Sequence, residues 1–224
     1  MCGRFTRTQS IPTLAKEFGI VEVNSDLRPS YNIAPTQEVA VIVTAGVKTL
    51  VPVRWGLVPS WAKDVSVGSK MINARAETVS EKPAYRNAFK KRRCLVVADG
   101  FYEWQSIAGA KRPIHIRFKS GKPFGFAGLY ETWNSPEGEE ITTCTIITTE
   151  ANELMRPIHE RMPVIIPKEK EDLWLDPKTE EQALLLGLLK PYPADQMEAY
   201  PVSKKVNSPR NNSPDCLTRL MVKA

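Results

Sequence analysis

Four runs typical of β-strands follow one another in residues 94–129, CLVVADGFYEWQSIAGAKRPIHIRFKSGKPFGFAGL. The runs are rich in β-branched and aromatic residues, which favour an extended backbone. Glycine, proline and charged residues separate them, as expected at turns. The runs occupy residues 94–98, 101–105, 114–118 and 124–129. This region therefore predicts a series of short strands that are close in sequence.

The strand pattern continues on both sides of this region. Residues 141–148 and 162–166 follow it with the same composition. Residues 39–44 and 50–58 precede it and are expected to pair with each other, with Gly46 in the turn between them. The core of the protein is therefore expected to be rich in strands.

The helices are expected to be short. Ser10 is a suitable N-cap for a helix that ends at Phe18, because Gly19 follows as a C-cap. The helical segments predicted are residues 10–18, 80–93, 151–155, 173–175 and 180–189. We therefore predict an α+β fold, a single domain over residues 1–224 with an antiparallel, barrel-like core and short flanking helices.

The composition is that of a globular protein with a modest positive charge. Hydrophobic residues make up 42% of the 224 residues, which is too many for a disordered chain. The excess of 31 basic over 25 acidic residues gives a net charge of +6, which suits nucleic acid but serves solubility equally well. No targeting segment is recognisable, and no apolar run is long enough to span a bilayer. A cytoplasmic protein without a membrane partner is expected.

Cysteines and histidines are few and scattered. They are Cys2, Cys94, Cys144, Cys216, His115 and His159. Without closely spaced pairs of ligands, a structural zinc site is not expected. A disulfide framework is not expected in a chain of this length either, so the thiols are predicted to be reduced. No metal or organic cofactor is predicted.

Cys2 directly follows the initiator methionine, which is normally removed before a small second residue. The mature chain then begins with an amine and a thiol on adjacent carbons. Their reference pKa values, about 8 and about 8.5, leave both partly nucleophilic near neutrality. Such a pair attacks an aldehyde twice: the amine forms a Schiff base, and the sulfur then closes a thiazolidine ring. The alternative is an ordinary small side chain near a frayed terminus.

Two polar segments carry further candidate residues. In INARAET (residues 72–78), Asn73 and Arg75 alternate with apolar residues, as on a strand with one polar face. An amide suits a sugar hydroxyl or an amine, and a guanidinium suits a phosphate. In ADGFYEW (residues 98–104), Glu103 stands between aromatic residues that would desolvate it, raise its pKa and suit it to acid–base catalysis. The alternative for both segments is a strand with a solvated polar face.

The last three candidate site residues are a histidine, an arginine and a tryptophan. His159 lies in RPIHERMP (residues 156–163) and is suited to moving protons near neutral pH. Its alternative is a loop histidine bonded to the backbone. Arg161, two residues later, is expected to face the same way on an extended segment. Trp61, in WGLVPSW (residues 55–61), is suited to stacking on a nucleic-acid base.

Taken together, these segments resemble the SRAP (SOS-response-associated peptidase) family. The resemblance lies within residues 1–165, in the order of the family's motifs. The matching segments are MCGRF (1–5), YNIAP (31–35), WGLVPSW (55–61), INARAET (72–78), ADGFYEW (98–104) and IHERMP (158–163). Each motif is weak alone, but six in the family's order are specific.

The resemblance implies a sensor of abasic sites in single-stranded DNA. Cys2 would form a thiazolidine cross-link with the ring-opened abasic sugar, which protects the lesion from strand cleavage. Asn73 would position the Cys2 amine or the sugar, and Glu103 would transfer protons. His159 would assist ring opening and release of the cross-link.

The resemblance also implies how DNA is held. Arg4, Arg75 and Arg161 would bind the phosphates that flank the lesion, and Trp61 would lie near the DNA end. Replication-fork or junction DNA is a further expected partner, and a monomer is expected. The family is also associated with removal of its own N-terminal segment, here Met1, and a lyase activity would follow from the Schiff base.

Two other functions remain open at this point. Class II glutamine amidotransferases and other N-terminal-nucleophile hydrolases also begin Met-Cys-Gly and use the cysteine, so release of glutamate from glutamine would identify that class. A non-covalent nucleic-acid-binding module would instead depend on the basic cluster at residues 90–93. Its binding would survive Cys2→Ala, and no denaturant-stable adduct would form.

Overall fold

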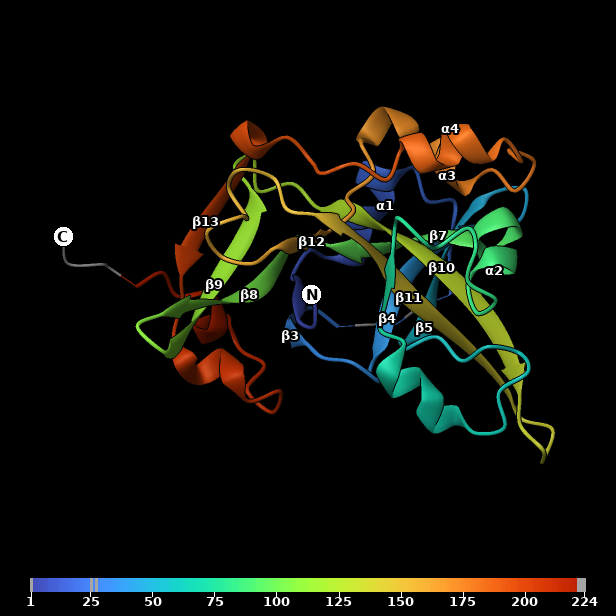
Figure 1. The fold of residues 1–224 in the computed structure, drawn as a ribbon, viewed down its shortest axis with the longest axis horizontal. Coiled ribbons are helices and arrows are strands. Elements are labelled where there is room, and N and C mark those ends of the chain that lie inside the picture. Colours follow the sequence, from blue (N-terminus) through green and yellow to red (C-terminus); the bar gives the residue numbers. More distant parts are fainter. Residues whose placement is uncertain (1, 25, 27, 221–224) are drawn as a thin grey trace.

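The structure is a computed structural model that describes residues 2–24, 26 and 28–220, and strands dominate it (Figure 1). The strands are β1 (Phe5–Arg7), β2 (Glu22–Val23), β3 (Ser30–Ile33), β4 (Glu38–Thr44), β5 (Lys48–Trp55), β6 (Asn73–Arg75), β7 (Arg93–Ala98), β8 (Gly100–Ile107), β9 (Ala110–Phe118), β10 (Phe124–Asn134), β11 (Glu140–Glu150), β12 (Arg161–Pro163) and β13 (Met197–Pro201). The α-helices are α1 (Ile11–Phe18), α2 (Arg86–Lys91), α3 (Glu171–Leu175) and α4 (Gln182–Gly187). Short 3₁₀ segments are η1 (Val65–Lys70), η2 (Lys168–Lys170), η3 (Ala194–Gln196), η4 (Lys204–Asn207) and η5 (Pro214–Leu217). The predicted α+β class, with a strand-rich core and short helices, is confirmed.

The strands form two sheets, one of which closes on itself. The smaller sheet has the order β13-β9-β8-β1-β3, and the larger has the order β12-β11-β10-β7-β4-β5-β2. Strand β5 also pairs with β11, so that β11, β10, β7, β4 and β5 make a closed barrel. Most pairings are antiparallel, as predicted. Strands β5 and β6 pair with β11 in parallel, however, and so does β2 with β5.

Strand β7 is buried along its whole length because both of its faces are covered. Leu95 and Val97 join the apolar cluster that contains helix residues such as Trp174. Val96, on the opposite face, joins a second cluster with residues of the smaller sheet such as Phe101. Figure 1 shows the same arrangement, with α1, α3 and α4 on one side of the barrel and β8, β9 and β13 beside it. The uninterrupted apolar run of β7 thus separates two cores.

Two helix predictions are wrong in extent or type. Helix α2 covers Arg86–Lys91 only, and the preceding residues 80–85 form turns. Pro83 explains the late start, because a proline disfavours helical backbone at the residue before it. Residues 151–155 are not helical. There the side chain of Asn152 accepts a hydrogen bond from the Met155 backbone at 3.0 Å, as an N-cap does, but Pro157 has no N–H to donate and disfavours helical backbone at the preceding residue, so no helix continues.

The other helix predictions are confirmed within a few residues, at α1, α3 and α4. Ser10 caps α1 by accepting from the Thr13 backbone, and Gly19 ends it in the left-handed conformation with φ of 65°. No helix among the described residues has the length and apolar character needed to cross a membrane.

The basic cluster at residues 90–93 is only partly exposed. The Arg93 guanidinium is buried, and its Nε donates to the Trp174 carbonyl at 2.7 Å. Arg92 pairs with Glu131 at 2.6 Å. Only Lys90 and Lys91 of the cluster are exposed, so the surface predicted for a non-covalent nucleic-acid-binding module is much reduced.

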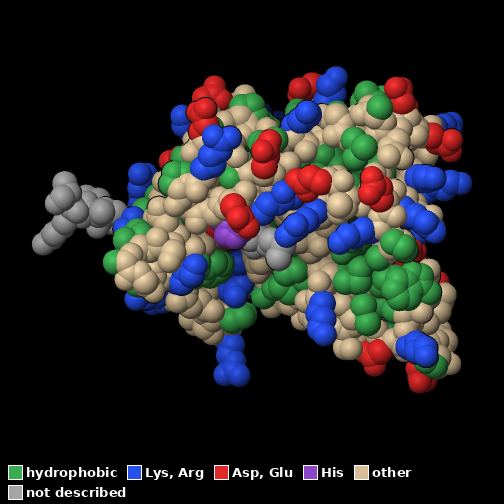
Figure 2. All heavy atoms as spheres, in the orientation of Figure 1, with side chains coloured by type: hydrophobic (Ala, Val, Ile, Leu, Met, Phe, Trp, Pro, Cys, Tyr) green, Lys and Arg blue, Asp and Glu red, His purple; other side chains and the backbone are tan. Residues whose placement is uncertain are grey.

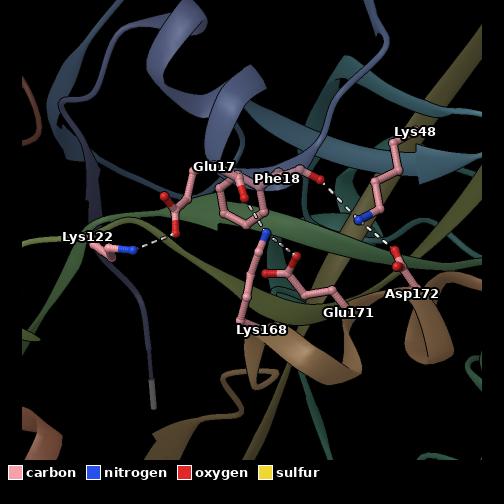
Figure 3. Close-up of polar contacts among 7 residues, drawn as sticks. All are labelled: Glu17, Phe18, Lys48, Lys122, Lys168, Glu171 and Asp172. Atoms are coloured by element: carbon pink, nitrogen blue, oxygen red, sulfur yellow. Dashed lines mark hydrogen bonds and ion pairs between the residues drawn. The ribbon is translucent and has the colours of Figure 1, made fainter.

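Two lysines fasten the C-terminal end of α1 to α3 (Figure 3). Lys48 donates to the Phe18 carbonyl at 3.0 Å and pairs with Asp172 at 2.6 Å. Lys168 pairs with the buried Glu171 at 2.9 Å, and its ammonium lies 4.9 Å from the centre of the Phe18 ring. A helix C-terminus carries partial negative charge, so both cations stabilise this end of α1.

His115 lies on β9 of the smaller sheet and is buried among aromatic side chains. Its Nδ1 is hydrogen-bonded with the Tyr200 hydroxyl at 3.1 Å, and its ring centre is 4.9 Å from that of Tyr102. Gly100 passes so close that a Cβ there would lie 2.2 Å from His115 Nε2. Only glycine fits at that point. Desolvation lowers the pKa of His115 to about 3.

This buried histidine predicts loss of stability in acid. The pKa of histidine in an unfolded chain is about 6.5, so its contribution is fully present above that pH. It is lost as pH falls from 6.5 toward 3, with a slope of up to about 1.4 kcal/mol per pH unit. Urea unfolding of wild type and of His115→Gln between pH 7.5 and pH 4.5 measures it. The wild-type slope is expected to be the steeper, and equal slopes would assign the acid sensitivity to other groups.

Candidate active site

The N-terminal segment is fixed in place by strand β1. Phe5 pairs with Ile33 on β3 and with Phe101 on β8, so β1 is a central strand of the smaller sheet. Asp99 holds it further by accepting hydrogen bonds from the hydroxyls of Thr6 at 2.6 Å and Thr8 at 2.7 Å. Cys2, three residues before β1, is thereby held at a defined position.

Cys2 is fully buried and contacts Asn73. The Asn73 Nδ2 donates to the Cys2 carbonyl at 3.0 Å and to the Ile72 carbonyl at 2.7 Å. Asn73 Oδ1 is buried and has no hydrogen-bond partner among the described residues. Burial raises the pKa of the Cys2 thiol well above its ordinary value. The site therefore holds a neutral thiol beside an amide oxygen that can accept another hydrogen bond.

Glu103 is the buried carboxyl group of the site. It lies on β8 and is 3% exposed. Burial raises its pKa, while the nearby charge of His159 acts in the opposite direction. The charge of Glu103 also contributes to the raised pKa of Cys2. The predicted desolvation of Glu103 is thus present, and it lies within electrostatic reach of both Cys2 and His159.

His159 lies at the end of a turn that is fastened to β8. Gln105 donates to the Pro157 carbonyl at 3.1 Å, and the His159 backbone donates to Met155 at 2.8 Å. The Arg161 backbone N–H donates to His159 Nδ1 at 3.0 Å. The same Nδ1 lies 3.2 Å from the Arg161 carbonyl, so both backbone groups of Arg161 contact the His159 ring. The backbone bond considered as the alternative for His159 is therefore present, and its role in the site stays a prediction.

Arg4 is engaged with the protein itself. Its Nη1 donates to the Asn32 side chain at 2.8 Å and to the Val206 carbonyl at 2.7 Å. Its guanidinium lies 5.7 Å from the centre of the Trp104 ring. Asn32, in turn, donates to carbonyls of the segment 206–211. Arg4 thus links the N-terminal segment to a segment some two hundred residues later.

The remaining DNA-contact candidates differ in exposure. Arg75 is exposed on β6, two residues from Asn73. Arg161 holds both carboxylate oxygens of Glu77, at 2.6 and 2.9 Å. Trp61 lies between β5 and η1 with 67% of its surface exposed. Figure 2 shows Lys and Arg side chains on the visible face of the molecule, interspersed with Asp and Glu side chains.

The structure thus brings Cys2, Asn73, Glu103 and His159 together, with Arg161 beside them. The sequence pattern missed Asp99, Asn32 and Glu77, although each lies inside a quoted motif. Glu77 had a readable signal, because it continues the alternation of Asn73 and Arg75. No three His, Cys, Asp or Glu side chains converge as metal ligands within the part of the chain that the structure describes.

The sequence of this chain is similar to a protein family and to individual known proteins. The family profile described as SOS response associated peptidase (SRAP) matches residues 1–209. The abasic site processing protein YoqW of Bacillus subtilis (strain 168) is 51% identical, over 97% of this chain and 99% of its own. The abasic site processing protein HMCES of Gallus gallus is 34% identical, over 85% of this chain and 66% of its own.

A crystal structure of a protein from Bacteroides thetaiotaomicron has the same fold. It superimposes with a TM-score of 0.89 at 30% identity and covers 98% of this chain and 100% of its own. The family profile and the similarity to YoqW both extend over most of the chain. The chain therefore belongs to the SOS response associated peptidase (SRAP) family.

Proposed function

We propose that this protein captures the aldehyde of an abasic site in single-stranded DNA as a thiazolidine on Cys2, after removal of Met1. The observation that carries the proposal is the fixed Cys2, held by Asn73 beside the buried carboxyl of Glu103. The substrate class comes from the relatives, which are named abasic site processing proteins. Removal of Met1, by the chain itself or by an aminopeptidase, is the required first step.

The first chemical step is attack of the Cys2 amine on the sugar aldehyde. The amide oxygen of Asn73 is suited to accept a hydrogen bond from that amine, because it is buried and available. Such a bond would aim the nitrogen lone pair at the carbonyl carbon. Addition gives a carbinolamine, and loss of water from it gives the imine.

Proton transfer by Glu103 is assigned to the next two events. Its raised pKa favours the protonated form, which donates a proton to the departing hydroxyl so that water leaves. What remains is the protonated imine, whose nitrogen keeps its hydrogen. The Glu103 carboxylate then takes the thiol proton as sulfur bonds to the imine carbon, and the electron pair of the C=N bond moves to the nitrogen, which becomes a neutral N–H. The net change is one C–N bond, one C–S bond and one water released. His159 is assigned to opening the sugar ring and to the reverse reaction.

Contacts to DNA are assigned to three arginines and one tryptophan. Arg75 is exposed two residues from Asn73 and is placed to hold a phosphate next to the lesion. Arg4, two residues after Cys2, and Arg161, two residues after His159, complete the set. Trp61 is exposed enough to stack on a base. Fork and junction DNA contain the same single-stranded element.

Intact mass spectrometry tests the proposal in one measurement. The protein is mixed with a single-stranded oligonucleotide that carries one abasic site. The expected product has the mass of the chain without Met1 plus the oligonucleotide, less one water. An oligonucleotide with a tetrahydrofuran analogue, which has no aldehyde, is the control and should give no adduct. An adduct on chains that keep Met1, or none at all, would contradict the mechanism.

A further inference from the structure

Arg161, assigned above to a DNA phosphate, already holds a carboxylate. Its Nη1 and Nη2 donate to the two oxygens of Glu77 at 2.6 and 2.9 Å, and Nη2 also donates to the Thr148 carbonyl at 2.7 Å. This two-pronged geometry is the one in which a guanidinium binds two oxygens of a phosphate. The Arg161 side chain is only 15% exposed, so it has little freedom to bind both groups at once.

Glu77 follows closely after the two polar residues of β6, Asn73 and Arg75. Asn73, Arg75 and Glu77 alternate with the buried Ala74 and Ala76. The strand register with β11 continues past β6, because the Ala76 backbone donates to the Thr148 carbonyl at 2.9 Å. Strand β6 ends at Arg75, and a turn follows in which the Thr78 backbone donates to the Arg75 carbonyl at 3.1 Å. Glu77 lies in this turn, two residues from the exposed Arg75, so a phosphate held by Arg75 comes close to the ion pair of Glu77 and Arg161.

We propose that Glu77 occupies the site on Arg161 at which a DNA phosphate would bind, so that DNA must displace Glu77 to bind. This inference rests on the proposed function, because it takes a DNA phosphate as the competing ligand. The consequence is weak binding to undamaged single strands. Only a strand with an aldehyde gains the covalent bond that makes its capture last.

The ion pair is of a kind that a phosphate can replace. Glu77 is half exposed, at 51%, and ion pairs this open to water are weak. The hydrogen bond from Arg161 lowers the pKa of Glu77, so the carboxylate is charged at neutral pH and repels an approaching phosphate. The free energy needed to displace Glu77 is therefore small, and it lowers the affinity of damaged and undamaged strands alike.

Equilibrium binding of undamaged oligothymidine, at one fixed salt concentration, tests this role. Glu77→Gln is compared with Glu150→Gln. Glu150 is exposed and lies directly opposite Arg161 across β11 and β12, and Arg161 makes its ion pair with Glu77 instead. Glu77 and Glu150 line the same surface pocket, so both variants remove one negative charge from it. Glu77→Gln is expected to bind about threefold more tightly than Glu150→Gln. Equal or weaker binding would show that Glu77 only supports Arg161, and would overturn the proposal.

A double-mutant cycle makes the test specific to the contact. In an Arg161→Gln background, Glu77→Gln is expected to change affinity no more than Glu150→Gln does, and a retained threefold gain would overturn the proposal. If Glu77→Gln has a lowered thermal midpoint, Glu77→Asp replaces it in the test, because aspartate keeps the negative charge but its shorter side chain reaches Arg161 less well. It is expected to bind more tightly than wild type, and affinity at or below that of wild type would overturn the proposal.

The wild-type adduct is measured in parallel by mass spectrometry, with the abasic oligonucleotide. If the adduct forms and Glu77→Gln binds no more tightly than its control, the role of Glu77 is wrong while the covalent function stands. If no adduct forms and the affinity still rises, the role of Glu77 stands and the covalent function is wrong.

Discussion

Cys2→Ala is expected to abolish the denaturant-stable adduct with abasic DNA while leaving non-covalent binding to single-stranded DNA nearly unchanged. Alanine is also small, so Met1 is still removed and the terminal amine is still present. Without sulfur the ring cannot close, and the imine that remains hydrolyses in water. Denaturing electrophoresis measures the adduct, and fluorescence anisotropy at fixed salt measures the binding.

Two controls sharpen this prediction. Cys216→Ala removes a buried thiol outside the apolar cluster that contains Cys2, and it should retain full adduct yield. Borohydride reduction should restore a stable adduct in Cys2→Ala, because it traps the imine formed by the amine. An undiminished adduct in Cys2→Ala without reduction would refute the thiazolidine.

Glu103→Gln is expected to slow cross-link formation by about 100-fold, the range in which a positioned acid–base group contributes. Glutamine keeps the size of the buried side chain but cannot transfer a proton. Because burial raises the pKa of Glu103, the acid form persists toward neutral pH and is lost as pH rises. The rate ratio of wild type to variant should therefore fall with increasing pH. Single-turnover rates across the pH range measure this ratio.

The exposed Glu139→Gln provides the matched control for the charge change and should react at the wild-type rate. A thermal midpoint for each variant separates lost chemistry from lost folding. Equal rates for Glu103→Gln and wild type would remove Glu103 from proton transfer.

Local sequence patterns predicted the elements better than the contacts between them. The buried strand β7 and the pairing of β4 with β5 could be predicted from the sequence, because an apolar run and the residues of a turn are signals within a few residues of each other. The parallel pairing of β6 with β11 was not, since nothing near Asn73 indicates a partner some seventy residues away. That pairing is what brings Asn73 to its place in the site.

The same limit applies to charged side chains. Arg93 reads as the solvated end of a helix, yet its guanidinium is buried against carbonyls of the chain. Arg161 reads as a free cation, yet Glu77 holds it. Exposure of an arginine depends on which carbonyls and carboxylates surround it after folding, and sequence spacing does not reveal them. The chemical types at the site were therefore predicted, and their engagement was not.

The bonds from Arg4 and Asn32 to the carbonyls of residues 206–211 have a consequence for protein synthesis. A chain still attached to the ribosome lacks these acceptors until residues 206–211 have emerged. The segment that carries Cys2 is made long before the residues that hold Arg4 and Asn32 in place. A chain without residues 206–211 is thus expected to be a poor scavenger of stray cellular aldehydes, and the reactivity proposed for Cys2 should appear only once that segment has been made.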